Sequence, residues 1–249
     1  MKNILLSVAL STVIGSGSAL AADIRIGTEG AYVPWNYIDD KGELAGYEID
    51  LGREMCKRAK LSCEFVINEW DSIIPNLLAG NYDIIMAGMS VTDERKESIN
   101  FSAEYYPPDP SRFAGATNVN ADFDNLTGLK IGAQGATIQA AYVESNFAKG
   151  NTVLTFETPD QSIADLVAGN IDLLLADNSF LAPIVEGSAG AISFVGPAIP
   201  IGGGIAMGLR KSDHELAETM NAALESMKVD GTVDKLLLEY FEIDSVYAN

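Results

Sequence analysis

The sequence predicts an α/β protein of two lobes, each with a mostly parallel sheet flanked by helices, and three observations lead to this prediction. First, the stretch LLAGNYDIIMA at residues 77–87 returns as LVAGNIDLLLA at residues 166–176. Second, segments typical of strands and helices alternate along the chain, as they do where helices join parallel strands. Third, two Pro/Gly-rich stretches, at residues 107–110 and 197–204, interrupt this alternation. Such stretches favour extended crossings between two lobes.

Each copy of the repeated stretch has the pattern of a helix that ends and leads into a buried strand. Gly80 and Gly169 follow apolar helical positions, and glycine readily adopts the left-handed conformation at a helix C-terminus. The Ile, Leu and Met residues that follow suit a strand covered on both faces. The offset of 89 residues (166 minus 77) is longer than solenoid repeats of up to ~50 residues. The pattern A-G-x-x-D is also common in unrelated α/β proteins, so a duplication is one of two interpretations.

The first 21 residues have the three parts of a secretory signal peptide. Lys2 is followed by an apolar segment at 4–14 and by small residues ending in Ala19-Leu20-Ala21. The apolar segment is shorter than the ~20 residues that a membrane-spanning helix needs. We expect cleavage after Ala21 or Ala22, which leaves an exported chain of 228 residues (249 minus 21).

The predicted first lobe begins with a strand-helix-strand-helix-strand series, with a hairpin-like turn between the first strand and the first helix. Thr92 or Asp93 then begins a short helix that carries Arg95. The five elements of the series lie at residues 24–28, 46–60, 63–67, 71–80 and 82–87, and the turn lies at residues 39–42.

The predicted second lobe repeats the alternation, and the last elements return to the first lobe. We expect residues 22–108 and 205–249 to form lobe one and residues 109–204 to form lobe two, with hinge crossings near 105–112 and 197–206. Two crossings between two lobes make a hinge that can close on a ligand. The predicted elements are strands at 129–133, 152–156, 171–176 and 205–209, and helices at 137–147, 159–168, 178–186, 213–228 and 231–240.

The charge of the chain excludes some classes of partner. Lys and Arg number 16 against 35 Asp and Glu, and removal of Lys2 with the signal peptide leaves 15 against 35, a net charge of −20. Nucleic acids and anionic membrane surfaces require a basic surface, so we expect neither as a partner. Acidity also keeps many exported proteins soluble, so it does not by itself indicate a cationic ligand.

The two cysteines, Cys56 and Cys63, predict a disulfide. An even number of cysteines in an exported protein favours pairing. Residues seven positions apart cannot pair within one helix, so the chain must turn near residues 59–61 and bring the next strand back. A metal or redox pair is the alternative, but the C-x-x-C spacing and a nearby histidine are missing. We therefore expect no metal and no cofactor.

Polar and aromatic residues follow the predicted strands, and ligands in open parallel sheets bind outside the carboxyl ends of the strands. If the two lobes face each other, these segments meet across one cleft. The set lacks a plausible nucleophile-base pair, and the single histidine, His214, lies in a polar helix. The candidate ligand-binding residues are Glu29, Tyr32, Trp70, Ala87, Gly88, Met89, Ser90, Arg95, Gln134, Thr137, Ile138, Gln139 and Asp177.

Several of these residues together suit a zwitterion. Arg95 offers a planar donor pair for a carboxylate, and the helix N-terminus near Thr137 and Ile138 offers backbone donors to the same anion. Asp177 could accept an ammonium, with Ser90 as a further acceptor. Each residue also has a structural interpretation, since an arginine after a capping threonine often makes a surface ion pair and an aspartate at a strand end often caps a helix.

Longer motifs resemble the polar amino-acid-binding proteins of bacterial ABC importers, in the lysine/arginine/ornithine- and histidine-binding branch. The resemblance covers essentially the whole mature chain and implies a two-lobed periplasmic-binding-protein fold of type II with a two-strand hinge. The most specific motifs are GYEIDLGREMCKR, the Cys56/Cys63 pair, EWDSIIPNLLAGNYDIIMAGMSVTDERKESINFS, GLRK at 208–211 and DGTVDKLLLEYF at 230–241.

The resemblance also implies roles for individual residues. It implies that Arg95, in SVTDER, holds the ligand carboxylate and that Asp177 holds the α-ammonium, with Ser90 touching either group. Tyr32 and Trp70 would sandwich the ligand side chain, and Glu29 would reach its basic end.

The chain departs from the family's pattern at some positions. Ala87 and Gly88 stand where the family often has serines, and residues 136–138 read Ala-Thr-Ile in place of a G-T-T or G-S-T triplet. Backbone contacts survive these changes but hydroxyl contacts do not, so the side-chain end of the pocket is expected to differ.

The resemblance predicts a monomeric periplasmic protein that captures a cationic L-amino acid, arginine first, then lysine or ornithine, and delivers it to an ABC permease without catalysis. One alternative ligand is an opine or another polar amino acid. A second alternative is an enzyme on the same scaffold, similar to the cyclohexadienyl dehydratases that act on arogenate or prephenate. A third is a sensor that presents the ligand to a receptor.

Overall fold

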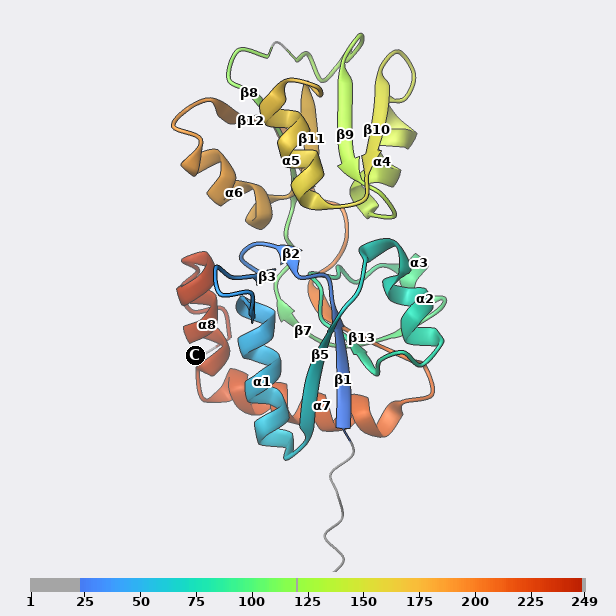
Figure 1. The fold of residues 1–249 in the computed structure, drawn as a ribbon, viewed down its shortest axis with the longest axis vertical. Coiled ribbons are helices and arrows are strands. Elements are labelled where there is room, and N and C mark those ends of the chain that lie inside the picture. The colour runs from blue at the N-terminus through green and yellow to red at the C-terminus, as the bar shows by residue number, and fades with distance from the viewer. Residues whose placement is uncertain (1–22, 120, 248–249) are drawn as a thin grey trace, which may run out of the picture.

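A computed structural model describes residues 23–119 and 121–247, and it shows two lobes stacked along the long axis of the molecule (Figure 1). The predicted signal peptide lies outside the described residues. Within the described part of the chain, no helix combines the length and the apolar character needed to cross a bilayer.

Lobe one, as we use the term here, contains a five-stranded sheet in the order β5-β1-β6-β13-β7. β5 and β6 run parallel to β1, whereas β13 runs antiparallel to both β6 and β7. Four strands therefore share one direction and β13 is reversed. The strands are β1 (Asp23–Thr28), β5 (Ser62–Ile67), β6 (Ile84–Ile85), β7 (Asn100–Tyr106) and β13 (Ile205–Leu209).

Helices cover the sheet of lobe one, and a small second sheet lies at its upper end, toward the other lobe (Figure 1). The small sheet holds the predicted turn, in which the Gly42 N–H donates to the Asp39 carbonyl at 2.9 Å. Its strands are β2 (Ala31–Tyr32), β3 (Asn36–Ile38) and β4 (Leu44–Ala45). The helices are α1 (Tyr47–Ala59), α2 (Ile73–Leu78) after a 3-10 turn (Trp70–Ser72), α3 (Asp93–Lys96), α7 (His214–Val229) and α8 (Thr232–Phe241).

Lobe two repeats this plan with a sheet in the order β10-β9-β11-β8-β12. Here β10 and β11 run parallel to β9, and β8 is the reversed strand, antiparallel to β11 and β12. The elements are β8 (Ser111–Ala116), β9 (Lys130–Gln134), α4 (Ile138–Phe147), β10 (Thr152–Phe156), α5 (Pro159–Ala168), β11 (Leu173–Asp177), α6 (Asn178–Gly187) and β12 (Ile192–Ile199).

The chain passes between the two sheets twice, from β7 to β8 through residues 107–110 and from β12 to β13 through residues 200–204. Figure 1 shows the two connections side by side between the lobes. The prediction of a Pro/Gly-rich crossing from residue 197 was too early, because β12 continues to Ile199. Gly196 and Pro197 are tolerated there because β12 is an edge strand with a register irregularity between Val195 and Ile199.

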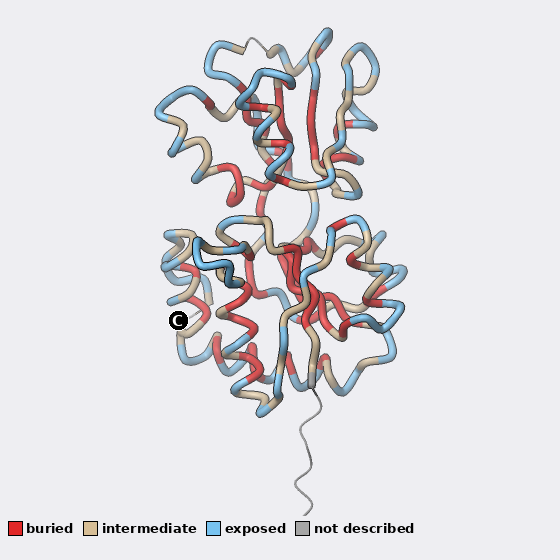
Figure 2. The backbone as a smooth tube through the Cα atoms, in the orientation of Figure 1, coloured by how far each residue is buried: buried red, intermediate tan, exposed pale blue. Residues whose placement is uncertain are grey.

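The repeated stretch behaves as predicted in both lobes. Gly80 has φ of 79° and Gly169 has φ of 73°, so both adopt the left-handed conformation just after a helix. The strands that follow, β6 and β11, occupy the centre of their sheets and are buried (Figure 2). Strand β6 is shorter than predicted, with two residues in place of six.

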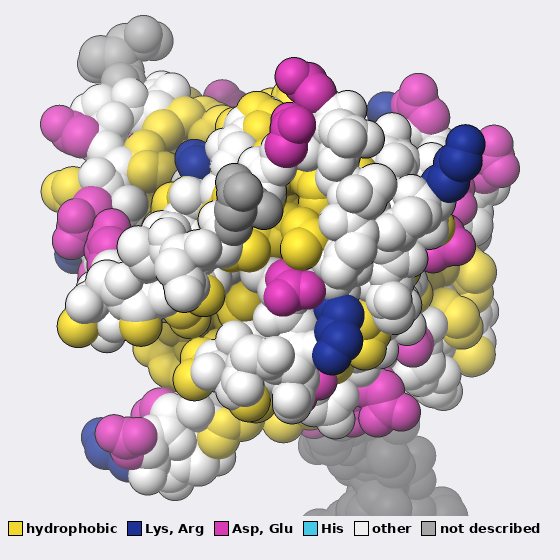
Figure 3. All heavy atoms as spheres, turned by 90° about the horizontal axis from the view of Figure 1, so that it is seen from above, with side chains coloured by type: hydrophobic (Ala, Val, Ile, Leu, Met, Phe, Trp, Pro, Cys, Tyr) yellow, Lys and Arg dark blue, Asp and Glu magenta, His cyan; other side chains and the backbone are white. Residues whose placement is uncertain are grey.

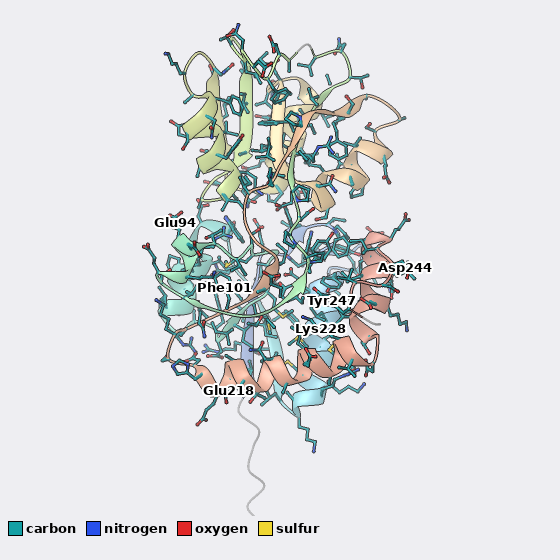
Figure 4. All side chains as sticks on the ribbon, turned by 180° about the vertical axis from the view of Figure 1, so that it is seen from behind. Glu94, Phe101, Glu218, Lys228, Asp244 and Tyr247 are labelled. Carbon is teal, nitrogen blue, oxygen red and sulfur yellow. A yellow bond between two sulfur atoms is a disulfide. The ribbon has the colours of Figure 1, made fainter. Side chains whose placement is uncertain are left out.

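Each lobe has apolar residues packed on both faces of its sheet. The buried clusters of lobe one share no buried residue with those of lobe two. In lobe one an aromatic cluster links α1 and α8 to the hinge-side strand β7, through Trp35, Tyr47, Tyr106 and Phe241. The segment after α8 returns to α7, where the Lys228 ammonium lies 4.3 Å from the centre of the Tyr247 ring (Figure 4). Acidic side chains are dispersed over the outer face of lobe two, where fewer basic ones are seen (Figure 3).

The predicted disulfide joins Cys56, near the end of α1, to Cys63 in β5, with a Cα–Cα distance of 6.2 Å. The chain turns between them at Lys60, which has φ of 57°. The pairing predicted from the cysteine count is therefore confirmed.

Candidate functional site

A cavity of about 520 Å³, counting the part open to solvent, lies between the lobes at the carboxyl ends of the parallel strands. Both lobes supply its walls. Its lining includes these residues singled out from the sequence: Glu29, Tyr32, Trp70, Ala87, Gly88, Ser90, Arg95, Gln134, Thr137, Ile138, Gln139 and Asp177.

Met89 was a wrong prediction as a cavity residue. Its side chain is fully buried in the core of lobe one, packed with residues such as Ile85 and Ile99. Its neighbours Gly88 and Ser90 do line the cavity.

The cavity also has lining residues that the sequence reasoning missed. Pro159 and Ser162 lie at the start of α5, directly after β10, so applying the strand-end rule to β10 would have found them. The others are Leu174, Leu175 and Ala176 within β11 and Phe180 in α6. No local signal marks these four, because their exposure to the cavity depends on where lobe one sits.

Arg95 enters the cavity from α3, a helix of one turn. Thr92 caps this helix, and its Oγ1 accepts the Arg95 N–H at 3.1 Å. The guanidinium donates from Nη1 to the Ser90 carbonyl at 2.8 Å and lies 5.2 Å from the centre of the Trp70 ring. Desolvation lowers the pKa of Arg95 to about 10, against the opposing charges of Asp177 and Glu94.

No carboxylate forms an ion pair with Arg95 within residues 23–119 and 121–247. A guanidinium carries five N–H donors, and the Ser90 carbonyl accepts from one of its nitrogens. Arg95 is therefore a largely desolvated cation that still has donors for an anion placed in the cavity.

Asp177 ends β11 on the opposite side of the cavity and is 9% exposed. Its two carboxylate oxygens accept from the Tyr32 hydroxyl and from Gln139 Nε2, both at 2.7 Å. Desolvation raises its pKa to about 7, the charge of Asp109 adds to this, and the Tyr32 bond, Arg95 and the Gln139 bond oppose it. Asp177 occupies the N-cap position of α6, as the structural interpretation expected, but its side chain makes no capping hydrogen bond.

Glu29 follows β1 at another part of the cavity and is 8% exposed. Its Oε1 accepts from Gln134 Nε2 at 2.5 Å. Burial raises its pKa to about 7, and the negative charges of Glu69, Asp160 and Asp71 add to the rise, whereas the Gln134 bond lowers it. Glu29 therefore lies just after the first strand without facing bulk water.

Aromatic side chains form part of the walls. The Tyr32 ring stacks on Phe180 across the lobes, with centroids 4.2 Å apart and planes 5° from parallel. Trp70 is 8% exposed, and its Nε1–H donates to the Ala136 carbonyl at 3.2 Å. One face of Tyr32 is thus occupied by Phe180.

The N-terminus of α4 also faces the cavity, through Thr137 and Ile138. Thr137 Oγ1 accepts the Ala140 N–H at 3.0 Å and donates to the Gln134 carbonyl at 2.6 Å. This cap fixes the first turn, whose remaining N–H groups and dipole favour a negative group nearby.

Direct hydrogen bonds join the lobes around the cavity, so the structure is closed. Tyr32 bonds Asp177, and Glu29 bonds Gln134. A further bond lies outside the cavity, where Trp35 Nε1 donates to Ser179 Oγ at 2.9 Å at the start of α6. Asp109, in the first crossing, accepts the Ser179 N–H at 3.0 Å.

Known proteins resemble this chain along almost its full length. The lysine/arginine/ornithine-binding periplasmic protein of Escherichia coli (strain K12) is 35% identical, and the match covers 96% of this chain and 95% of that protein. The L-arginine-binding protein of Pseudomonas aeruginosa is 33% identical, with all of both chains covered.

A solved structure, a periplasmic His/Glu/Gln/Arg/opine family-binding protein from Silicibacter pomeroyi in complex with lysine, is 50% identical. The match covers 90% of this chain and all of that one with a TM-score of 0.83. Residues 24–243 match the bacterial extracellular solute-binding proteins, family 3, so the chain belongs to this family.

Proposed function

We propose that this protein binds a cationic L-amino acid, with arginine as the first candidate and lysine or ornithine next, and delivers it to the permease of an ABC importer. It would act as a periplasmic monomer after removal of an N-terminal signal peptide at Ala21 or Ala22. The names of the E. coli and P. aeruginosa relatives and the lysine bound to the S. pomeroyi protein support this ligand class.

The observation that carries the proposal is the set of buried charges in the cavity. Arg95 is a cation without a carboxylate partner among the described residues, whereas Asp177 and Glu29 are desolvated carboxylates bonded to uncharged donors. A cationic α-amino acid carries one carboxylate and two positive groups. Its charges are therefore the complement of those in the cavity.

Each charged group of the ligand has an oppositely charged partner in the cavity. The α-carboxylate would bind Arg95 and the first turn of α4, and the α-ammonium would bind Asp177. The side-chain cation would lie near Glu29, beside the Trp70 ring, where cation–π attraction adds about 0.5–2 kcal/mol. A neutral amino acid would leave Glu29 desolvated and without a counter-ion, which costs free energy.

Binding is coupled to closure because each lobe supplies some of the groups that contact the ligand. Arg95 and Glu29 belong to lobe one, whereas Asp177 and α4 belong to lobe two. Only a closed state lets one ligand contact all four, and a ligand shifts the open-closed equilibrium only by its differential affinity for that state.

A panel of ligands tests the proposal. Thermal-shift and calorimetric titrations would compare L-arginine, L-lysine, L-ornithine, L-histidine, L-glutamine and octopine. A ligand at a thousandfold excess over its Kd stabilises the folded protein by about 4 kcal/mol, so the preferred ligand gives a large shift. We expect arginine, lysine or ornithine to bind most tightly.

Two results would contradict the proposal. Tighter binding of octopine or glutamine than of any cationic amino acid would move the assignment to the opine or neutral class, for which Ala87 and Gly88 leave room. Consumption of the bound ligand on a catalytic timescale would favour the enzyme alternative, and arogenate and prephenate belong in that assay.

A further inference from the structure

Glu48 is a completely buried carboxylate that does not line the cavity. It lies in the first turn of α1, and its exposed fraction is 0%. Burying a carboxylate costs free energy unless hydrogen-bond donors satisfy it. The donors around Glu48 therefore identify the segments that it holds in place. The N-terminal end of a helix also favours a negative charge at this position.

The first partner of Glu48 is a segment of the cavity wall. Glu48 Oε1 accepts the Gly88 backbone N–H at 2.7 Å. Gly88 has φ of 61°, and a Cβ built on it would lie 3.5 Å from the Tyr32 ring. The backbone at this point is therefore held between a buried carboxylate on one side and a cavity side chain on the other.

The second partner leads to another segment of the wall. Asn36 Nδ2 donates to Glu48 Oε2 at 2.7 Å, and Asn36 Oδ1 accepts the Gly30 backbone N–H at 2.7 Å. Gly30 directly follows Glu29. Asn36 is itself 0% exposed, so its bond to Glu48 has no access to water.

The third partner comes from the hinge side. The Tyr105 hydroxyl donates a short hydrogen bond to Glu48 Oε1, and the Tyr105 carbonyl accepts from the Tyr47 hydroxyl at 2.7 Å. Tyr105 lies in β7, one residue before that strand ends at the first crossing. One carboxylate thus contacts donors from β7, from the small sheet and from the segment after β6.

We infer that Glu48 is a positioning residue for the cavity: it fixes the segments 29–32 and 87–90 relative to each other, through Asn36 and the Gly88 N–H. The inference rests on the proposed function, because it takes this cavity to be the ligand site. Glu48 itself does not line the cavity.

The polarity of the relay explains why a carboxylate is needed. The Gly30 N–H forces Asn36 to present its oxygen there, so the Asn36 NH₂ must face an acceptor. A glutamine at position 48 would offer one oxygen for Gly88 and Tyr105 and turn its own NH₂ toward that of Asn36. Two donors would then face each other in the buried interior. Asn36 would have to move or rotate, which would disturb its bond to Gly30 and so the position of the adjacent Glu29.

The test is a polarity swap. Glu48→Gln should weaken L-arginine binding by about tenfold to a hundredfold, since it disturbs both wall segments. Adding Asn36→Asp should restore binding to within about threefold. The introduced aspartate can accept both from Gly30 and from the introduced glutamine, so the network keeps one negative charge and all its hydrogen bonds. Only the bond between positions 36 and 48 changes direction.

Amide resonances of ligand-free protein provide a second measurement. The Gly30 and Gly88 amide protons should shift in Glu48→Gln and return toward their wild-type positions in the double variant. Glu54→Gln is the matched control, because Glu54 lies on the same helix and its ion pairs among the described residues are to Lys57 and Arg58. It should leave both amides and the affinity unchanged.

The outcomes separate this inference from the proposed function. Wild-type protein that does not bind arginine would contradict the proposed ligand, while the amide shifts would still decide the role of Glu48. Glu48→Gln with unchanged affinity and unmoved Gly30 and Gly88 amides would overturn the inference. If the single variant does not fold, the double variant decides. The inference is overturned if the double variant is also unfolded, or if it folds but binds arginine over tenfold more weakly than wild type.

Discussion

The two lobes share one sheet plan but contribute different chemistry to the cavity. The orders β5-β1-β6-β13-β7 and β10-β9-β11-β8-β12 correspond strand for strand, and the repeated stretch leads into β6 in one sheet and β11 in the other. The buried apolar residues that define these strands are similar in both copies. The scaffold therefore depends on a pattern that both lobes retain.

The residues that follow corresponding strands have diverged. Glu29 follows β1 and Gln134 is the last residue of β9, and these two side chains meet across the cavity at 2.5 Å. β11 ends in Asp177, whereas the segment after β6 provides Gly88, which offers no side chain. A common scaffold thus becomes a site for an asymmetric ligand by changes at the strand ends, and the predictions below test how the lobes divide this work.

The largest effect is expected from removing one charge of either lobe. Arg95→Ala and Asp177→Ala should each weaken binding of every amino-acid ligand by about 3–5 kcal/mol, because each leaves a desolvated ligand charge without its partner. Isothermal titration with L-arginine measures the loss. Arg53→Ala, which removes an exposed arginine of α1, is the control. Either cavity variant binding within tenfold of wild type would show that the α-amino-acid contacts are misassigned.

A smaller and selective effect is expected at Glu29. Glu29→Gln should weaken arginine and lysine binding by about 1.5–3 kcal/mol, the range for hydrogen bonds to charged groups, and leave a neutral ligand about as well bound as before. Adding Gln134→Glu moves the carboxylate to the corresponding position of lobe two and should recover part of the loss. Equal losses for charged and neutral ligands would instead indicate that Glu29 acts on the shape of the pocket.

The two raised carboxyl pKa values predict opposite effects of pH on affinity and stability. Asp177 and Glu29 both have a pKa of about 7 in the ligand-free protein, and a cationic ligand requires their ionised forms. Arginine affinity should therefore fall as the pH drops below about 7, by up to about tenfold per pH unit for each carboxylate.

Stability of the ligand-free protein changes in the other direction. The ordinary pKa values are 3.8 for Asp and 4.5 for Glu, so between these values and about 7 the folded state binds more protons than the unfolded state. This contribution to the free energy of unfolding is present below the ordinary values and is lost as the pH rises through about 7. Urea unfolding at several pH values, with Asp177→Asn and Glu29→Gln as controls, measures it. An affinity independent of pH across this range would contradict the assignment of both carboxylates.

The smallest effect is expected at the contact between the lobes outside the cavity. Trp35→Phe removes the hydrogen bond to Ser179 and should weaken arginine binding by about 0.5–1.5 kcal/mol, mainly through faster dissociation, because that bond joins the closed lobes. The loss should be equal for any neutral ligand, in contrast with Glu29→Gln. A loss confined to cationic ligands would place Trp35 in the recognition of the side chain.

Local patterns predicted the parts of the fold and the cavity that depend on local chemistry. Gly80, Gly169 and the Thr92 cap follow from backbone conformation alone, and the strand-end rule found cavity residues in both lobes. Phe180 was missed because its stacking on Tyr32 exists only after the lobes meet.

Two further errors have other causes. Met89 was included because it lies between two cavity residues, although its side chain packs into the core of lobe one. β12 was missed because Gly196 and Pro197 argue against a strand, and only the pairing with β8 at a sheet edge makes them acceptable.

The strand order also has a consequence for how the protein is made. All the strands of lobe two come from one continuous stretch, β8 to β12, whereas β13, which lies between β6 and β7 in lobe one, comes only at residues 205–209. A chain that emerges with its N-terminus first can therefore complete lobe two while β6 and β7 still lack the strand between them. Unpaired strand edges are prone to aggregation, so lobe one is the half that would need protection during export. Folding would finish only when one of the last strands enters the centre of the first sheet.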